Sequence, residues 1–128
     1  MSWDIVIFSS RQKISTIEEV DEELLVAIDF NIILEKHFIN IIANKNHREI
    51  KGKGYIIDYF FDSEPVSNKL FRLYGEEALF ELIRIAKIYD WQIFDTGNGE
   101  MLDLEHPEKN GYSNFQSYLK QVLKNTGN

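Results

Sequence analysis

The sequence contains no cysteine, and this absence excludes several kinds of chemistry. Without thiols the chain has no disulfide framework, no thiolate metal site and no cysteine nucleophile. It also has no apolar run near the roughly 20 residues that a membrane-spanning helix requires. Its first four residues lack the basic and apolar regions of a signal peptide. We therefore expect a cytoplasmic protein that does not enter a membrane.

Positive charge is scarce, since 14 Lys and Arg residues stand against 21 Asp and Glu, for a net charge of −7. Nucleic acids and anionic membranes reward a positive surface, so this balance disfavours binding to either. An acidic surface is compatible with a basic protein partner, and equally with solubility alone. Apolar residues, in contrast, are abundant: 44% of the 128 residues are hydrophobic, enough for one domain with a substantial core.

Sequence motifs that identify an enzyme are missing as well. There is no zinc-binding histidine spacing, no Gly-x-Ser-x-Gly elbow and no glycine-rich phosphate loop before a helix. An acidic set near His106 invites a metal-site interpretation, but its spacing fails the calcium-loop pattern. The set consists of Asp95, Glu100, Asp103 and Glu105. We expect no metal, no cofactor and no catalytic residue, with a small enzyme that uses carboxylates and His106 as an alternative.

Hydrophobic periodicity predicts the elements of the first half of the chain. Residues 3–8 are β-branched and aromatic and predict an interior strand. Residues 14–28 mix acidic and apolar side chains, a pattern compatible with a short helix or an ordered loop, and we favour a loop with a helical turn. Asp29 is a suitable N-cap for a helix that runs to about Ile42, because apolar residues recur at helical spacing from Phe30 onward.

The second half begins with two strands, residues 54–61 and 68–74, which are joined by a turn and therefore antiparallel. A second helix opens near Gly75 and runs to about Tyr89. Its apolar residues cover most of its circumference, so we expect it to be the most buried helix. A closing helix follows Ser113, which forms a capping-box pattern with Gln116. Its apolar stripe consists of Phe115, Leu119, Val122 and Leu123.

Residues 91–104 predict a β-hairpin between these two helices. Its tip is placed at Asn98 and Gly99, because this pair favours the positive φ angles of a type I′ turn. In that register Thr96 faces Met101. A longer loop that begins at Asp95 would shift the register and is left open.

The predicted order is β, α, β, β, α, β, followed by an added strand and helix. The first six elements follow the order of a ferredoxin-like sandwich, in which two helices cover one face of an antiparallel sheet. We therefore expect a single α+β domain, residues 1–128, with a ferredoxin-like core and a C-terminal extension.

Three stretches of the sequence resemble a group of small bacterial proteins of uncharacterised function. They are Trp3-Asp4-Ile5, Tyr74-Gly75-Glu76-Glu77-Ala78, and Trp91-Gln92-Ile93-Phe94-Asp95-Thr96-Gly97 continuing through Glu100. The resemblance implies a bacterial, single-domain, intracellular protein. It brings no activity, ligand or catalytic residue.

Two groups of residues are candidates for partner binding. Asp58 and Arg72 are expected to form a cross-strand charge pair on the outer face of the sheet, beside Phe60 and Tyr74 as exposed aromatics. The closing helix could instead cover that face. The second group is acidic and consists of Glu18, Glu19, Glu22 and Glu23. Both groups favour a non-catalytic protein-binding module, which could be immunity-like and neutralise a basic partner such as a secreted toxin.

An RNA-binding, RRM-like domain is the alternative, because residues 53–60 partly match the RNP1 pattern. Lys53, Gly54, Tyr55 and Phe60 fit this pattern. Ile56, Ile57 and Asp58 do not. Tyr55 and Phe60 fall on opposite faces of a strand, and Asp58 would place a carboxylate beside phosphates. We therefore rank this function below protein binding.

Overall fold

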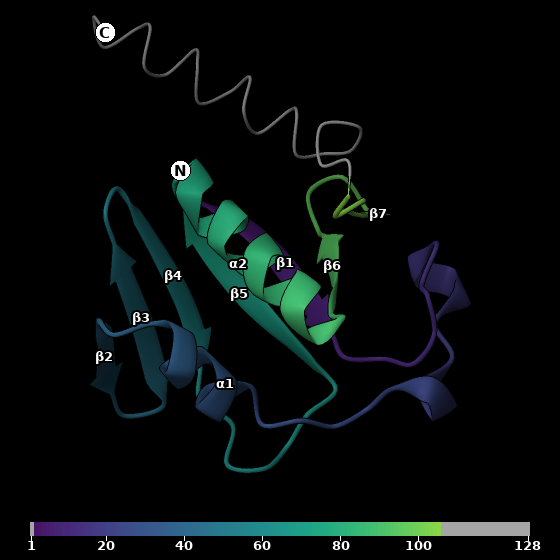
Figure 1. Ribbon diagram of the computed structural model, residues 1–128, viewed down its shortest axis with the longest axis horizontal. Coiled ribbons are helices and arrows are strands. Elements are labelled where there is room, and N and C mark those ends of the chain that lie inside the picture. The colour runs from purple at the N-terminus through teal and green to yellow at the C-terminus, as the bar shows by residue number, and fades with distance from the viewer. Residues whose placement is uncertain (1, 106–128) are drawn as a thin grey trace, which may run out of the picture.

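In the computed structural model, which describes residues 2–105, a seven-stranded sheet carries two α-helices on one face (Figure 1). Every strand pair is antiparallel, and the strand order is β2-β3-β4-β5-β1-β6-β7. The strands are β1 (Trp3–Phe8), β2 (Ile41–Asn44), β3 (His47–Gly52), β4 (Tyr55–Phe60), β5 (Asn68–Tyr74), β6 (Gln92–Asp95) and β7 (Glu100–Met101). The helices are α1 (Phe30–His37) and α2 (Glu76–Tyr89), with 3-10 helices η1 (Ile17–Glu19) and η2 (Glu22–Leu24).

The predicted α+β class is confirmed, and the sheet is larger than the sequence predicted. Strands β4, β5, β1 and β6 lie side by side in the middle of the sheet. The hairpin of β2 and β3, which the sequence analysis did not predict, extends the sheet beyond β4 (Figure 1). The predicted loop at residues 106–111 and the closing helix after Ser113 lie outside the described residues.

The predicted helix at residues 29–42 is wrong in its second half. Asp29 caps α1 as expected, since its Oδ1 accepts a hydrogen bond from the backbone N of Ile32 at 3.2 Å. The helix ends at His37, and Ile41–Asn44 form β2 instead. Two β-branched isoleucines favour the strand, and a turn at residues 45–46, where Lys45 has a φ of 56°, returns the chain to β3.

Residues 14–28 form the ordered loop with helical turns that the sequence predicted. The side chain of Gln12 holds this loop, because it donates to the backbone O of Glu19 and accepts from the backbone N of Asp21, both at 2.7 Å. Asp21 caps η2 through a hydrogen bond from the backbone N of Glu23. Neither 3-10 helix contains a buried residue, so the acidic side chains face solvent.

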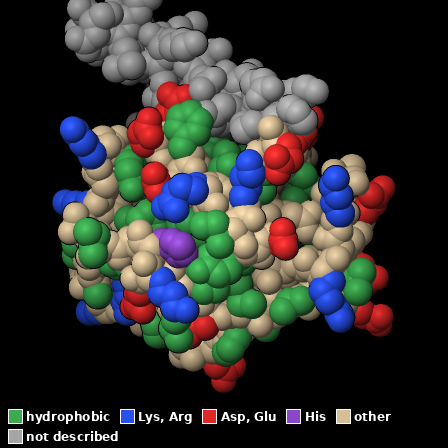
Figure 2. All heavy atoms as spheres, viewed as in Figure 1, with side chains coloured by type: hydrophobic (Ala, Val, Ile, Leu, Met, Phe, Trp, Pro, Cys, Tyr) green, Lys and Arg blue, Asp and Glu red, His purple; other side chains and the backbone are tan. Residues whose placement is uncertain are grey.

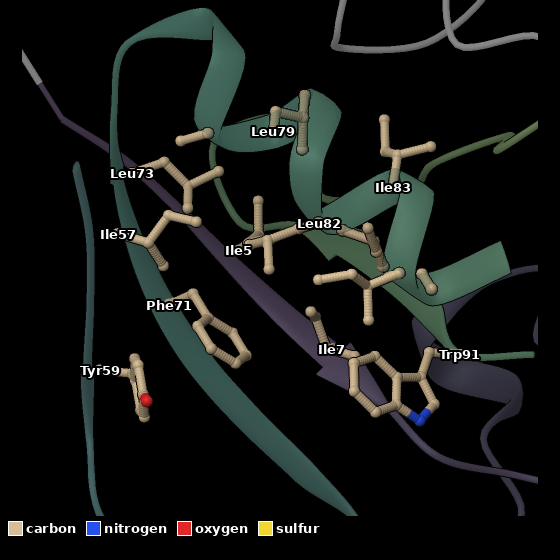
Figure 3. Close-up of a cluster of buried hydrophobic side chains, with 14 of the residues drawn as sticks. Ile5, Ile7, Ile57, Tyr59, Phe71, Leu73, Leu79, Leu82, Ile83 and Trp91 are labelled. Atoms are coloured by element: carbon tan, nitrogen blue, oxygen red, sulfur yellow. The ribbon is translucent and has the colours of Figure 1, made fainter. Parts of the chain in front are cut away.

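The core lies between the sheet and the two helices. Alternate residues of β1 and β5 point toward α2 and are fully buried, as Ile5, Ile7, Phe71 and Leu73 illustrate (Figure 3). Of the two α-helices in residues 2–105, α2 has more buried residues, in agreement with the prediction. Its buried residues are Ala78, Leu79, Leu82, Ile83, Ile85 and Ala86.

Gly75 is required where β5 turns into α2. Its φ is 92°, and a Cβ atom there would lie 2.6 Å from the backbone O of Gly54. The turn before α2 therefore packs directly against the turn between β3 and β4, and no side chain fits between them.

The C-terminal hairpin has a longer loop than the predicted Asn98-Gly99 turn. Phe94 pairs with Met101 and Asp95 with Glu100, which leaves residues 96–99 as the loop. The predicted register, in which Thr96 faces Met101, is wrong. The alternative of a longer loop and a shifted register is correct, although the loop begins after Asp95 and not at it.

The reason for the longer loop is the side chain of Asp95, which is fully buried. Its Oδ1 accepts hydrogen bonds from the backbone N of Gly97 at 2.9 Å and from the indole Nε1 of Trp3 at 2.5 Å. Its Oδ2 accepts from Nδ2 of Asn98 at 3.1 Å. Aspartate side chains stabilise turns in this way, and here one carboxylate fixes both the loop and its attachment to β1.

No helix within residues 2–105 is long and apolar enough to cross a membrane.

Candidate functional site

One face of the sheet is free of helices among the described residues, and we call it the outer face. It is opposite α1 and α2, on the far side of the sheet in the view of Figure 1. Figure 2 shows the helix-covered side, where basic, acidic and apolar side chains are interspersed. The strands alternate their side chains between the two sides, so the outer face receives every second residue.

An apolar row crosses the outer face from strand to strand. Leu70 and Phe94 are the Cα partners of Val6 on either side of β1, and Met101 is the partner of Phe94. Leu70 is 52% exposed, and the other three residues are half-buried. Phe60, at the end of β4, is on the same face and is 65% exposed. Neighbouring apolar side chains that remain exposed are typical of an interaction surface.

A charged row runs beside the apolar row. It consists of Glu49, Asp58, Arg72 and Asp4, which are successive Cα partners across β3, β4, β5 and β1. Three of these four side chains are acidic. Ion pairs within the row and with its neighbours balance much of this charge.

The ion pairs on the outer face differ from the predicted one. Asp58 and Arg72 do face each other in the register. However, Nε of Arg72 lies 3.3 Å from Oδ1 of Asp4, on the strand at its other side. Oδ1 of Asp58 lies 3.5 Å from Nε2 of His47. The predicted pair is therefore replaced by two other contacts, because Arg72 lies closest to the carboxylate of Asp4 and Asp58 lies closest to the imidazole of His47.

Asp58 is a titratable group of the outer face whose pKa is shifted from its ordinary value. Burial raises the pKa of its carboxyl, and the nearby His47 opposes this shift while Glu49 adds to it. The His47 ring also packs edge-on against Phe60, with centroids 5.7 Å apart. The charged row and the apolar row thus meet at these side chains.

The structure brings together one predicted partner-binding group and leaves the other apart. Phe60 and Arg72 are exposed, whereas Asp58 and Tyr74 are half-buried on the same face. The acidic group, Glu18, Glu19, Glu22 and Glu23, is fully on the surface. It lies on the loop that carries η1 and η2, away from β4 and β5 (Figure 1).

A cavity of about 870 Å³ was not predicted from the sequence. Residues 10–15, the end of α2 and residues 101–105 surround it, so it is formed by segments far apart in the chain. Its apolar lining includes Ile14 and Trp91. The side chain of Gln92 fixes one wall, since it accepts from the backbone N of Ile14 and donates to the backbone O of Gln12, both at 2.6 Å.

The charged lining of this cavity is mixed. It consists of Arg11, Lys13, Lys87, Asp90, Asp103 and Glu105. Nζ of Lys87 lies 3.6 Å from Oε2 of Glu105. His106, the side chain of the alternative enzyme hypothesis, lies outside the described residues.

The acidic set considered for a metal is dispersed. Asp95 is buried in the hairpin, where its oxygens accept hydrogen bonds from the loop and from Trp3, whereas Glu100 and Glu105 are exposed. Asp95 therefore belongs to the buried structure of the hairpin, unlike the exposed Glu100 and Glu105. Across residues 2–105, no group of three or more His, Asp or Glu side chains could hold a metal ion.

A buried polar cluster near Phe60 was also not predicted from the sequence. Lys69 is 6% exposed, and its Nζ donates to the backbone O of Phe60 and to Oδ2 of Asp62. Nδ2 of Asn31, in α1, donates to the backbone O of Asp62 at 2.9 Å. Burial raises the pKa of the neighbouring Tyr59 to about 12. This cluster fixes the chain as it leaves β4, directly behind the exposed Phe60 ring.

The RNP1-like stretch has the geometry that its alternation predicted. The Tyr55 phenol faces α2, where burial and the nearby Glu81 raise its pKa. Phe60 lies on the outer face. The two aromatic positions therefore do not form one stacking platform, which an RNA-binding sheet requires.

Comparison of the chain with protein-family models, with curated proteins and with solved structures found no match. The function is therefore inferred from the geometry and the charge of the described residues.

Proposed function

We propose that the protein is a non-catalytic protein-binding module that binds its partner on the outer face. The observation that carries this proposal is the apolar row beside the charged row on a face that no helix of residues 2–105 covers. Leu70 and Phe60 supply exposed apolar area. Arg72 and Asp4 supply polar groups at its border. An apolar centre with a polar border is the usual composition of protein–protein interfaces.

We further propose that the partner is basic and that the role is immunity-like, the neutralisation of a basic protein such as a toxin. The support is the net charge of −7 and the exposed acidic group at η1 and η2. Charges of one sign accelerate association with an oppositely charged protein without contacting it closely. In this proposal the acidic group attracts the partner and the outer face binds it.

The test is affinity purification from a lysate of the source cells with matched bait proteins. Leu70→Asp places a charge in the apolar row, whereas Ile88→Asp makes the same change at an equally exposed position, 55% against 52%, on α2. We expect a basic protein that is retained by the wild type and by Ile88→Asp, is lost with Leu70→Asp, and dissociates at high salt. Absence of any such protein, or equal loss with both variants, would contradict the proposal.

We also propose that β4, β5, β1 and β6, together with α1 and α2, form a ferredoxin-like unit. The support is the antiparallel order of these four strands and the placement of α1 after β1 and of α2 after β5. The hairpin of β2 and β3 is then an insertion between α1 and β4. Strand β7 is an addition at the opposite edge.

A second candidate, an enzyme that uses carboxylates and His106, is favoured by one observation. The cavity is lined by three acids, Asp90, Asp103 and Glu105, and the last of these directly precedes His106 in the chain. An imidazole held among these carboxylates would have a pKa well above the ordinary value of about 6.5. NMR titration of His106 tests this, and a pKa near the ordinary value would exclude the candidate.

A further inference from the structure

Strand β2 forms one edge of the sheet, and β3 is its single strand neighbour among residues 2–105. Residues 38–44 read Phe-Ile-Asn-Ile-Ile-Ala-Asn, with no charge, no proline and no glycine. Edge strands of soluble proteins usually carry lysine, proline or a bulge, which prevent pairing with another chain. This edge has none of these protections within the strand.

The free backbone groups of β2 follow from its hydrogen bonds with β3. The backbone O of Asn40 accepts from the backbone N of Lys51 at 3.0 Å, so Asn40 faces β3. In an antiparallel pair this orientation alternates from residue to residue. The N–H and C=O groups of Ile41 and Ala43 therefore point away from the sheet. They present the donors and acceptors that an additional strand requires.

Exposed apolar side chains accompany these backbone groups. Ile39 is 98% exposed and Ile42 is 48% exposed, and Ile42 lies on the outer face opposite Glu49 of β3. Such side chains gain from contact with a neighbouring strand because they leave water. The uncharged edge thus has both hydrogen-bonding capacity and apolar area.

We propose that β2 pairs in an antiparallel manner with β2 of a second copy of this chain, so that two sheets become one. Two molecules of charge −7 repel each other. Residues 38–44 carry no charge, so two copies can meet there without bringing like charges together. A basic partner finds no carboxylate in this stretch. In a dimer with two-fold symmetry the same residues of both copies form the contact, and an antiparallel pair of β2 strands has this symmetry.

A register centred on Ile42 satisfies this geometry. Ile41 of one copy then exchanges two hydrogen bonds with Ala43 of the other, and the reverse pair does the same. The two Ile42 side chains lie opposite each other as a non-hydrogen-bonded pair, the closer kind of cross-strand contact. In this register Lys45 of one molecule does not lie opposite Lys45 of the other, so no like charges meet.

The test is the mass of the full chain in solution, measured by sedimentation over a range of concentrations. We expect a wild-type dimer that dissociates on dilution. Ile42→Lys should weaken it about 10-fold or more, because two lysines would meet at the axis. Ala43→Pro should do the same, since the N–H that it removes points away from β3 and has no role within one copy.

Phe60→Lys is the matched control, because it makes the same change at another exposed apolar residue of the outer face. We expect this variant to remain a dimer, and circular dichroism to show that all variants are folded. If Ala43→Pro does not fold, Ile42→Lys decides. A monomeric wild type, a dimer unaffected by Ile42→Lys, or equal dissociation with Phe60→Lys would overturn the proposal. Leu70→Asp should leave the dimer intact, so this test is independent of partner binding.

Discussion

The indole Nε1 of Trp3 donates a buried hydrogen bond of 2.5 Å to Oδ1 of Asp95, which is 92 residues away in the sequence. This contact joins the first strand to the loop of the last hairpin. It also explains why an acidic side chain is fully buried in this protein: the carboxylate accepts hydrogen bonds on both oxygens.

We expect Asp95→Ala to reduce the free energy of unfolding by about 2 to 4 kcal/mol, because it leaves the Trp3 indole and the loop amides without an acceptor. Glu100, the cross-strand partner of Asp95, is exposed and provides the control. Glu100→Ala should change the same quantity by less than about 0.5 kcal/mol. Urea denaturation monitored by tryptophan fluorescence measures both. A similar effect of the two variants would show that the buried carboxylate is not important for stability.

Lys69→Met should cost about 1 to 2 kcal/mol of stability, because the backbone O of Phe60 and the Asp62 carboxylate lose their buried donor. The partial exposure of Asp62 limits the cost, since water can replace the lysine there. Lys51 pairs with Glu49 on the surface. Lys51→Met should therefore have an effect near zero in the same chemical denaturation experiment.

Asp58 should make the protein more stable as the pH falls. Burial raises the pKa of its carboxyl in the folded state, so the folded protein binds this proton more tightly than the unfolded chain does. The carboxylate thus destabilises the fold at neutral pH. This penalty disappears as the pH falls from the raised pKa through the ordinary value. We expect Asp58→Asn to be more stable than the wild type at pH 7.

Denaturation of both proteins between pH 7 and pH 3 tests this dependence. The stability advantage of Asp58→Asn should shrink as the pH falls. Glu64→Gln removes the same charge at an exposed position that does not shift the pKa of Asp58, and it controls for the change in net charge. An advantage of Asp58→Asn that stays constant with pH would rule out the titration of Asp58 as its cause.

Two glycines with similar backbone angles should respond differently to alanine. A Cβ atom at Gly75, where φ is 92°, would lie 2.6 Å from the backbone O of Gly54, whereas a Cβ atom at Gly54, where φ is 82°, would have no atom within 4 Å. Gly54→Ala should cost about 1 to 2 kcal/mol, the strain of the left-handed region alone. Gly75→Ala should cost clearly more, because the clash adds to the strain. Thermal denaturation would contradict the close packing if the two costs were equal.

Local patterns in the sequence predicted an element correctly where they were compatible with only one secondary structure. The periodicity of α2 and the β-branched residues of β1 each indicate one structure. The stretch around Ile41, in contrast, has apolar residues at helical spacing and β-branched residues at the same time. Pairing with β3 decides between the two, and no local property of the sequence contains that information.

The features that the sequence did not reveal depend on contacts between distant segments. The loop length of the last hairpin depends on Trp3, which is needed to bury Asp95. The ion pair that Arg72 forms depends on Asp4, which lies on the neighbouring strand β1. The outer face was predicted because Asp58 and Phe60 belong to one strand. The cavity was not, because residues 10–15 and 101–105 form it together.

The central place of β1 in the sheet has a consequence for the order of folding. Strand β1 is synthesised before the other six strands of this sheet, yet both of its neighbours, β5 and β6, belong to the later part of the chain. The hairpins from β2 to β5 can form from adjacent segments before β1 has paired with a neighbouring strand. Because distant pairings are slow to close, insertion of β1 between β5 and β6 should limit the rate at which the native sheet appears.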